Sequence, residues 1–182
     1  KVFDGSGRPG RQGDIAVKNG KIAALGGRLP TSETKTIHDA DGLWLTPGLL
    51  DIHTHEDLEA ELDPGLPEVV RHGTTSVVVG NCSIGLAFGA QRNEQQDPIV
   101  DCFARVENIP KSVLAKTADK AVWTKPREYL EHLDQLPLAA NMAPFLPHSM
   151  LRIEVMGLQD SISRQPTATE LKRMVGILEE AL

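Results

Sequence analysis

Two histidines, His53 and His55, are the residues of this 182-residue chain with the clearest potential for chemistry; they end the segment Pro-Gly-Leu-Leu-Asp-Ile-His-Thr-His. In an extended strand, side chains at positions i and i+2 point to the same face, so both imidazoles should project together while Thr54 points away. Two neutral imidazoles held side by side can bind a divalent metal ion. The pair therefore predicts a metal site, although a His-x-His pair also arises by chance.

The apolar run before the histidines predicts the strand that would hold them. Leu49, Leu50 and Ile52 follow a Pro-Gly breaker and are typical of a buried parallel strand, which we expect over residues 49–53. Functional groups of parallel α/β proteins collect at the carboxyl ends of such strands. This context favours metal binding by the histidine pair.

A second strand, expected over residues 74–79, leads to a sulfur ligand candidate, Cys82. Residues 75–79 are β-branched apart from Ser76, and a Gly-Asn pair ends the run. The carboxyl ends of neighbouring parallel strands meet at one edge, so Cys82 and the histidine pair can share a site there. A thiolate is a good zinc ligand. Spacing alone favours the commoner interpretation of Cys82 as a small buried hydrophobic residue.

The motifs around these residues resemble the amidohydrolase superfamily, and more narrowly the D-aminoacylases, also called N-acyl-D-amino-acid deacylases. The His-x-His motif marks the superfamily, whereas Gly-Asn-Cys is the narrower signal. The resemblance implies that His53, His55 and Cys82 are metal ligands and that the cofactor is one or two zinc ions. It covers most of the chain and is carried by residues 47–55, 72–75, 80–82, 123–130, 141–144 and 147–157.

The function that the resemblance implies is zinc-dependent hydrolysis of linear amide bonds, with N-acyl-D-amino acids as substrates. Zinc lowers the pKa of a bound water to about 7, and a carboxylate then carries the proton to the leaving amine. The family's remaining histidine ligands and its acid/base aspartate have no counterpart up to Leu182. We therefore expect no catalytic acid/base residue within this chain, and no activity from this chain alone.

Two alternative functions stay open. The first is a cyclic amidase of the hydantoinase or dihydroorotase type; Cys82 disfavours it, and no lysine occupies an equivalent strand end. The second is an inactive binding or scaffold remnant that keeps the first part of the fold. Additional strand-end histidines and a late aspartate in a longer sequence would favour the enzyme.

Four further polar residues are candidates for supporting the ligands or contacting the substrate. Asp57 and Asp51 flank the histidine pair and could orient a ligand ring, or equally serve as turn or ion-pair groups. His148 follows a strand expected over residues 138–145. Arg152 has the planar guanidinium that suits a substrate carboxylate, although an internal salt bridge explains it equally well.

From residue 48 onward, strand and helix signals alternate, which predicts an α/β fold and the first portion of a (β/α)8 barrel over residues 48–182. A complete barrel takes about 250 residues, so we expect the chain to be the N-terminal part of a longer enzyme. The last helix begins at a capping box of Thr167 and Glu170 and carries an apolar stripe expected to pack in the core. That stripe comprises Leu171, Met174, Val175, Leu178 and Leu182. Earlier helices are expected over 66–72, 97–106 and 126–136.

Residues 1–47 lack this alternation and are expected to be part of a small β-sandwich domain. A hairpin is predicted over 14–18 and 21–25, because its central Asn-Gly pair suits a type I′ turn. Further short strands are expected over 36–39 and 43–45. No side chain of this region predicts chemistry.

Composition and charge exclude several classes of protein. The chain has 19 basic and 25 acidic residues, a net charge of −6 and no basic run, so nucleic-acid binding has little electrostatic support. Hydrophobic residues make up 40% without an apolar run near the ~20 residues of a membrane span. The two cysteines, Cys82 and Cys102, fit a reducing cytoplasm better than a disulfide scaffold. We therefore expect a cytoplasmic protein with a small-molecule partner; the oligomeric state is not predicted.

Overall fold

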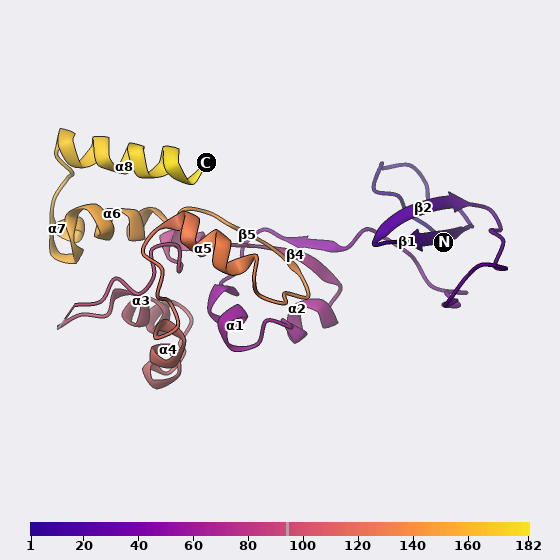
Figure 1. The fold of residues 1–182 in the computed structure, drawn as a ribbon, viewed down its shortest axis with the longest axis horizontal. Coiled ribbons are helices and arrows are strands. Elements are labelled where there is room, and N and C mark those ends of the chain that lie inside the picture. Colours follow the sequence, from indigo (N-terminus) through magenta and orange to yellow (C-terminus); the bar gives the residue numbers. More distant parts are fainter. Residues whose placement is uncertain (94) are drawn as a thin grey trace. The chain divides into compact units, whose positions relative to one another are not determined.

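The computed structural model describes residues 1–93 and 95–182, which form two compact units, Lys1–Gly48 and Leu49–Leu182. Figure 1 labels most of the elements of both units. Across the described residues, every helix is too short or too polar to cross a lipid bilayer.

The first unit contains the predicted hairpin. Strands β1 (Asp14–Lys18) and β2 (Lys21–Gly26) pair in antiparallel fashion. The turn residues Asn19 and Gly20 both have positive φ, 53° and 72°, as a type I′ turn requires. The hairpin prediction is confirmed, because turn chemistry of this kind depends on the two turn residues themselves.

The strands expected over 36–39 and 43–45 are wrong. Residues 36–39 are not part of any strand, and Leu45 forms only an isolated bridge with Val2. Local hydrogen bonds compete with pairing here: the Asp39 carboxylate accepts from the backbone N–H of Asp41, and the Asp41 carboxylate accepts from the next N–H along the chain. The segment therefore folds into turns.

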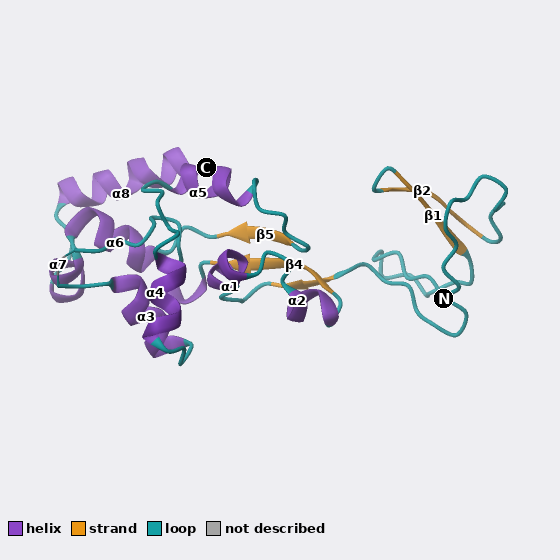
Figure 2. Cartoon of the chain, turned by 60° about the horizontal axis from the view of Figure 1, so that its bottom comes forward, coloured by secondary structure: helices purple, strands orange, loops and turns teal. Residues whose placement is uncertain are grey.

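The second unit is built on a parallel sheet in the order β3-β4-β5 (Figure 2), formed by Leu49–Asp51, Thr74–Val79 and Asn141–Pro144. Its central strand is the best covered, since Val77 and Val79 are each 1% exposed. Helices connect the three strands, so the predicted mixed α/β character is confirmed for this unit.

In the described part of the second unit, nine helical segments accompany the sheet. Those expected near residues 66–72, 97–106 and 126–136 and at the C-terminal end are present, although the third ends earlier than expected, at Leu133. Gly73, with φ of 84°, follows the first of them as expected. The segments are α1 (Asp57–Leu62), α2 (Pro67–Arg71), η1 (Asn81–Ser83), α3 (Pro98–Val106), α4 (Lys111–Ala118), α5 (Pro126–Leu133), α6 (His148–Met156), α7 (Leu158–Ser163) and α8 (Ala168–Ala181).

Strand β3 differs from its prediction in length and in burial. It ends at Asp51, so both histidines lie in the loop that follows it. Leu49, Leu50 and Ile52 are 58%, 61% and 66% exposed. The reason is that β3 is an edge strand, paired with β4 alone among the described residues, and its side chains on both faces lack a covering layer.

Helix α8 confirms the predicted capping box but not the burial of its stripe. The hydroxyl of Thr167 accepts from the N–H of Glu170, and the carboxylate of Glu170 accepts from the N–H of Thr167. Met174 is buried at 5% exposure, whereas Leu171 and Val175 are about half exposed. The helix packs one side against α6 and α5, and the described residues supply no second partner for its remaining apolar side.

Glu170 makes the start of α8 sensitive to pH. Hydrogen bonds from Arg164 and from the Thr167 N–H hold the pKa of the Glu170 carboxyl well below its ordinary value of 4.5. A carboxyl whose pKa is lower in the folded state stabilises the fold above its unfolded pKa, and this contribution is lost as pH falls through the folded pKa. We expect Glu170→Gln to lower the thermal unfolding midpoint at pH 7, with a gap from wild type that narrows below pH 4.5.

Far-UV circular dichroism over a pH series measures that gap, and Glu179→Gln, an exposed change on the same helix, is the matched control. An equal gap at pH 7 and pH 3 would contradict the ionic explanation.

Trp123 packs α5 against the loop that follows Cys82. Its indole stacks on Tyr129 with ring centroids 5.1 Å apart and on His132 at 4.6 Å. The indole N–H donates to the carbonyl of Leu86, and the residue is 6% exposed. Deletion of a side chain this large leaves a cavity, so we expect Trp123→Ala to lower the free energy of unfolding by about 3–5 kcal/mol.

Urea titration followed by circular dichroism tests this expectation. Tyr129→Phe is the control, because the Tyr129 hydroxyl is buried without a hydrogen-bond partner and its removal should cost little. A Trp123→Ala effect as small as that of the control would show that the stack contributes little.

Candidate metal centre

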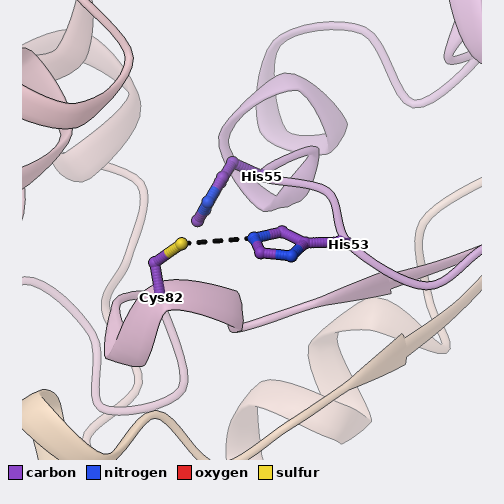
Figure 3. A group of neighbouring side chains, drawn as sticks. All are labelled: His53, His55 and Cys82. Atoms are coloured by element: carbon purple, nitrogen blue, oxygen red, sulfur yellow. Dashed lines mark hydrogen bonds between the residues drawn. The ribbon is translucent and has the colours of Figure 1, made fainter.

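Three side chains with metal-ligating atoms meet beyond the ends of β3 and β4: His53, His55 and Cys82. One ligating atom of each lies within 4.8 Å of the others. The Nε2 atom of His53 is 3.2 Å from Sγ of Cys82, and the two imidazole centroids are 5.9 Å apart. Figure 3 shows both rings directed toward the sulfur. Two imidazoles and a thiol are a donor set that zinc prefers.

The loop after β3, rather than the strand itself, sets the direction of the histidines. The Asp51 carboxylate accepts a 3.1 Å hydrogen bond from the backbone N–H of His53. Thr54 donates from both its N–H and its hydroxyl to the carbonyl of Val78, each at 3.1 Å. Because Thr54 is anchored to β4, its two neighbours project together on the other side.

The turn that carries Cys82 has a left-handed backbone at three of its residues. Gly80, Cys82 and Ser83 have φ of 80°, 52° and 64°. A Cβ at Gly80 would lie 2.7 Å from the carbonyl oxygen of Phe145, so only glycine fits there. Each left-handed residue with a side chain costs about 1–2 kcal/mol, and such strain is typical of functional turns. The Asn81 amide holds the turn by donating to Val78, at 2.8 Å.

The imidazole of His55 is enclosed by α3. Its Nε2 atom lies 3.6 Å from Oε1 of Glu107, and its ring meets Phe103 edge-on with centroids 5.9 Å apart. Its other nitrogen, Nδ1, is buried and has no hydrogen-bond partner. Buried polar atoms are nearly always satisfied, so an orphaned ring nitrogen beside a thiol and a second imidazole fits a bound metal ion.

Asp57 supports the loop that follows Cys82. It is 1% exposed, and its Oδ2 accepts from the N–H of Leu86 at 3.2 Å, whereas Oδ1 is buried without a partner. Burial raises the pKa of the Asp57 carboxyl to about 7. Burial, followed by a hydrogen bond with Glu59, likewise raises the pKa of Glu56 to about 7. The Asp57 hydrogen bond to Leu86 directs that carboxylate to the loop, and its role in orienting a ligand ring stays a prediction.

His148 and Arg152, both on α6, have different surroundings. His148, at the start of α6, lines a cavity of about 560 Å³ together with Cys82. Arg152 instead donates from Nη2 to the carbonyls of Ser161 and Arg164, at 2.6 and 3.0 Å, at the end of α7. These bonds occupy part of the guanidinium that substrate binding would need, and substrate contact by either residue stays a prediction.

Glu107 is the residue near the site that the sequence did not suggest. It follows α3, far from both motifs in the sequence, and no local pattern marks it. Only the packing of α3 against the loop after β3 brings its carboxylate to His55.

Comparison with known proteins finds relatives that are similar to the chain along almost its whole length. No family model matches the sequence. An uncharacterized protein of Mycobacterium tuberculosis is 39% identical over 99% of this chain, which corresponds to 29% of that protein. The N-acyl-D-aspartate deacylase of Alcaligenes xylosoxydans xylosoxydans is 36% identical over 100% of this chain and 33% of its own length.

The solved structures that resemble this chain are proteins of the same kind as the deacylase relative. A D-aminoacylase described as defining a subset of amidohydrolases superposes with a TM-score of 0.78 and 31% identity, over 99% of this chain and 34% of its own. The N-acyl-D-glutamate deacylase of Bordetella bronchiseptica, complexed with zinc and a phosphonate mimic of the tetrahedral intermediate, gives 0.77 and 30%, over 100% and 34%.

Over its whole length, the chain is similar to N-acyl-D-amino-acid deacylases and to a D-aminoacylase of the amidohydrolase class. The resemblance to the D-aminoacylase group that the motifs indicated is confirmed along the full sequence. The chain spans about a third of the length of the proteins it matches.

Proposed function

We propose that this chain forms the N-terminal third of a metal-dependent amidohydrolase that removes the acyl group from N-acyl-D-amino acids. The observation that carries the proposal is the meeting of His53, His55 and Cys82, with ligating atoms within 4.8 Å of one another. The names of the relatives support the substrate class, since they include deacylases of N-acyl-D-aspartate and N-acyl-D-glutamate.

Zinc is the proposed cofactor, held in this chain by His53, His55 and Cys82. The donor set suits zinc, and the N-acyl-D-glutamate deacylase structure contains it. A further D-aminoacylase is described with a binuclear metal centre, one-metal activation and second-metal attenuation, which supports one or two ions. When bound, the ion supplies Lewis-acid chemistry that polarises an amide carbonyl and acidifies a water molecule.

The residues of the chain prepare the site for that ion. The imidazoles must be neutral and the thiol deprotonated to act as ligands. Thr54 and Asp51 hold the histidine loop, and the left-handed turn at Cys82 directs the sulfur toward both rings. The cavity beside Cys82 offers about 560 Å³ for an acyl group or side chain, with His148 on its wall.

The arrangement of strands supports a barrel for the longer protein. Three successive strands lie side by side in chain order and in parallel, as the first strands of a (β/α)8 barrel do, and the proposed ligands follow the carboxyl ends of β3 and β4. The open edge of β3 fits a position beside a further strand. We propose that the acid/base aspartate and additional ligands belong to that longer protein, and that residues 1–47 belong to a β-sandwich domain.

The test is an assay of the full-length protein with added zinc. We expect release of free amine from N-acetyl-D-aspartate, N-acetyl-D-glutamate or N-acetyl-D-methionine, little release from the L-enantiomers, and loss of activity with a chelator. Hydrolysis of hydantoins or dihydroorotate in place of these substrates would establish the cyclic amidase alternative. Zinc binding without turnover of any amide would favour the other alternative, an inactive binding or scaffold remnant of the fold.

A further inference from the structure

The carboxylate of Glu107 faces a ring nitrogen of a proposed ligand. Its Oε1 lies 3.6 Å from Nε2 of His55, and the two side chains are 32% and 12% exposed. This separation is slightly longer than a hydrogen bond, so the contact acts through the attraction between the carboxylate charge and the ring N–H. Among the described residues, His55 is the basic side chain that lies within 4.0 Å of the Glu107 carboxylate.

The position of Glu107 has no explanation in helix stability. The residue is the C-cap of α3, where its N–H donates to the carbonyl of Phe103 at 2.8 Å. The C-terminal end of a helix carries partial negative charge, which disfavours a carboxylate there and favours a cation. A glutamate at this point therefore needs a stabilising partner, and the His55 ring lies 3.6 Å from its carboxylate.

The two ring nitrogens of His55 have different surroundings, and these favour one tautomer. A carboxylate beside Nε2 favours the tautomer with its proton on Nε2, because that N–H is then directed at negative charge. The lone pair consequently lies on Nδ1, which is the buried nitrogen without a partner. Phe103, fully buried, packs edge-on against the ring and limits its rotation.

We propose that Glu107 is a positioning residue of the metal centre, which holds the His55 tautomer and ring orientation so that Nδ1 is the ligating atom. The inference rests on the metal site proposed above. Carboxylates that accept from the outer nitrogen of a ligand histidine raise the basicity of the ligand, and their loss typically weakens metal affinity 10–100-fold.

Zinc affinity of the full-length protein, measured by chelator competition, is the first test. We expect Glu107→Gln to weaken binding about 10–100-fold and Glu107→Ala to weaken it at least as much. Glu59→Gln is the matched control, because Glu59 lines the same small cavity as Glu107 and His55 but forms no ion pair with His55 among the described residues. We expect the control to bind zinc like wild type.

Nitrogen chemical shifts of labelled histidines in the metal-free protein supply a readout independent of activity. We expect His55 to be an Nε2–H tautomer in wild type and a mixture in Glu107→Gln, with equal melting temperatures for the two metal-free proteins. Unchanged zinc affinity and an unchanged tautomer in both Glu107 variants would overturn the inference. So would a loss of affinity that follows a lower melting temperature of the metal-free fold.

The outcome also separates this inference from the proposed function. A wild-type protein that binds no zinc would overturn the proposed function and this inference together. Zinc binding that is equal in wild type and Glu107→Gln overturns the inference alone.

Discussion

Replacement of Cys82 by alanine is expected to lower deacylase activity of the full-length protein by more than about 100-fold and to weaken zinc binding at least as strongly. The magnitude follows because loss of a residue that merely supports a ligand costs 10–100-fold, and Cys82 is proposed as a ligand itself. Its sulfur lies 3.2 Å from Nε2 of His53 and belongs to the group of three ligating atoms within 4.8 Å. Zinc content after dialysis and amine release from an N-acyl-D-amino acid measure both effects.

The other cysteine supplies the matched control. Cys102 is half-buried on α3, packs against the core and is not part of the ligand group. Cys102→Ala should retain zinc and activity, and any change it causes should appear in stability. A Cys82→Ala protein with wild-type zinc content and turnover would show that the sulfur is not a ligand.

A protein consisting of residues 1–182 alone is expected to hydrolyse no N-acyl-D-amino acid at a measurable rate, whereas the full-length protein does. The chain spans about a third of the deacylases it matches, and we propose that the acid/base aspartate belongs to the rest of the protein. The exposed side chains of Leu49 and Leu50 on the open edge strand β3, and of Ile52 just after it, also favour association of the isolated piece. Size-exclusion chromatography and amine release, both with added zinc, compare the two proteins.

The control for this comparison is the metal site of the piece itself. His53, His55 and Cys82 are all present, so the piece should still bind zinc if it folds, since three protein ligands are enough for a zinc site. Chelator-sensitive turnover by residues 1–182 at a rate comparable to the full-length protein would show that the rest of the protein is dispensable and that the proposal is wrong.

The sequence predicted those features that depend on neighbours in the chain. The type I′ turn at Asn19-Gly20, the left-handed Gly73 just after α2 and the capping box of Thr167 and Glu170 all formed as expected. Each depends on a few dihedral angles or hydrogen bonds between residues at most three positions apart, so residue type is sufficient. The candidate ligands could be named for a similar reason, because histidine and cysteine carry their metal chemistry wherever they lie.

The tertiary structure decided burial, direction and partners. Leu50 of β3 and Leu171 of α8 lie on apolar runs that predict burial, yet both remain exposed because the described residues supply no element to cover them. Burial is a property of what packs against a residue, and periodicity shows only which face is available.

In the candidate metal centre, too, some features were predictable from the sequence and others depended on the tertiary structure. Strand parity predicted that His53 and His55 share a face, but they lie beyond the strand, and the bonds of Thr54 to β4 direct them. Glu107 has no sequence signal at all, since its position depends on how α3 packs against the histidine loop. Residue types along the chain therefore determined which atoms can bind a metal. Contacts between distant segments decided how the histidine rings are directed and which carboxylate faces His55, because such contacts leave no local pattern in the sequence.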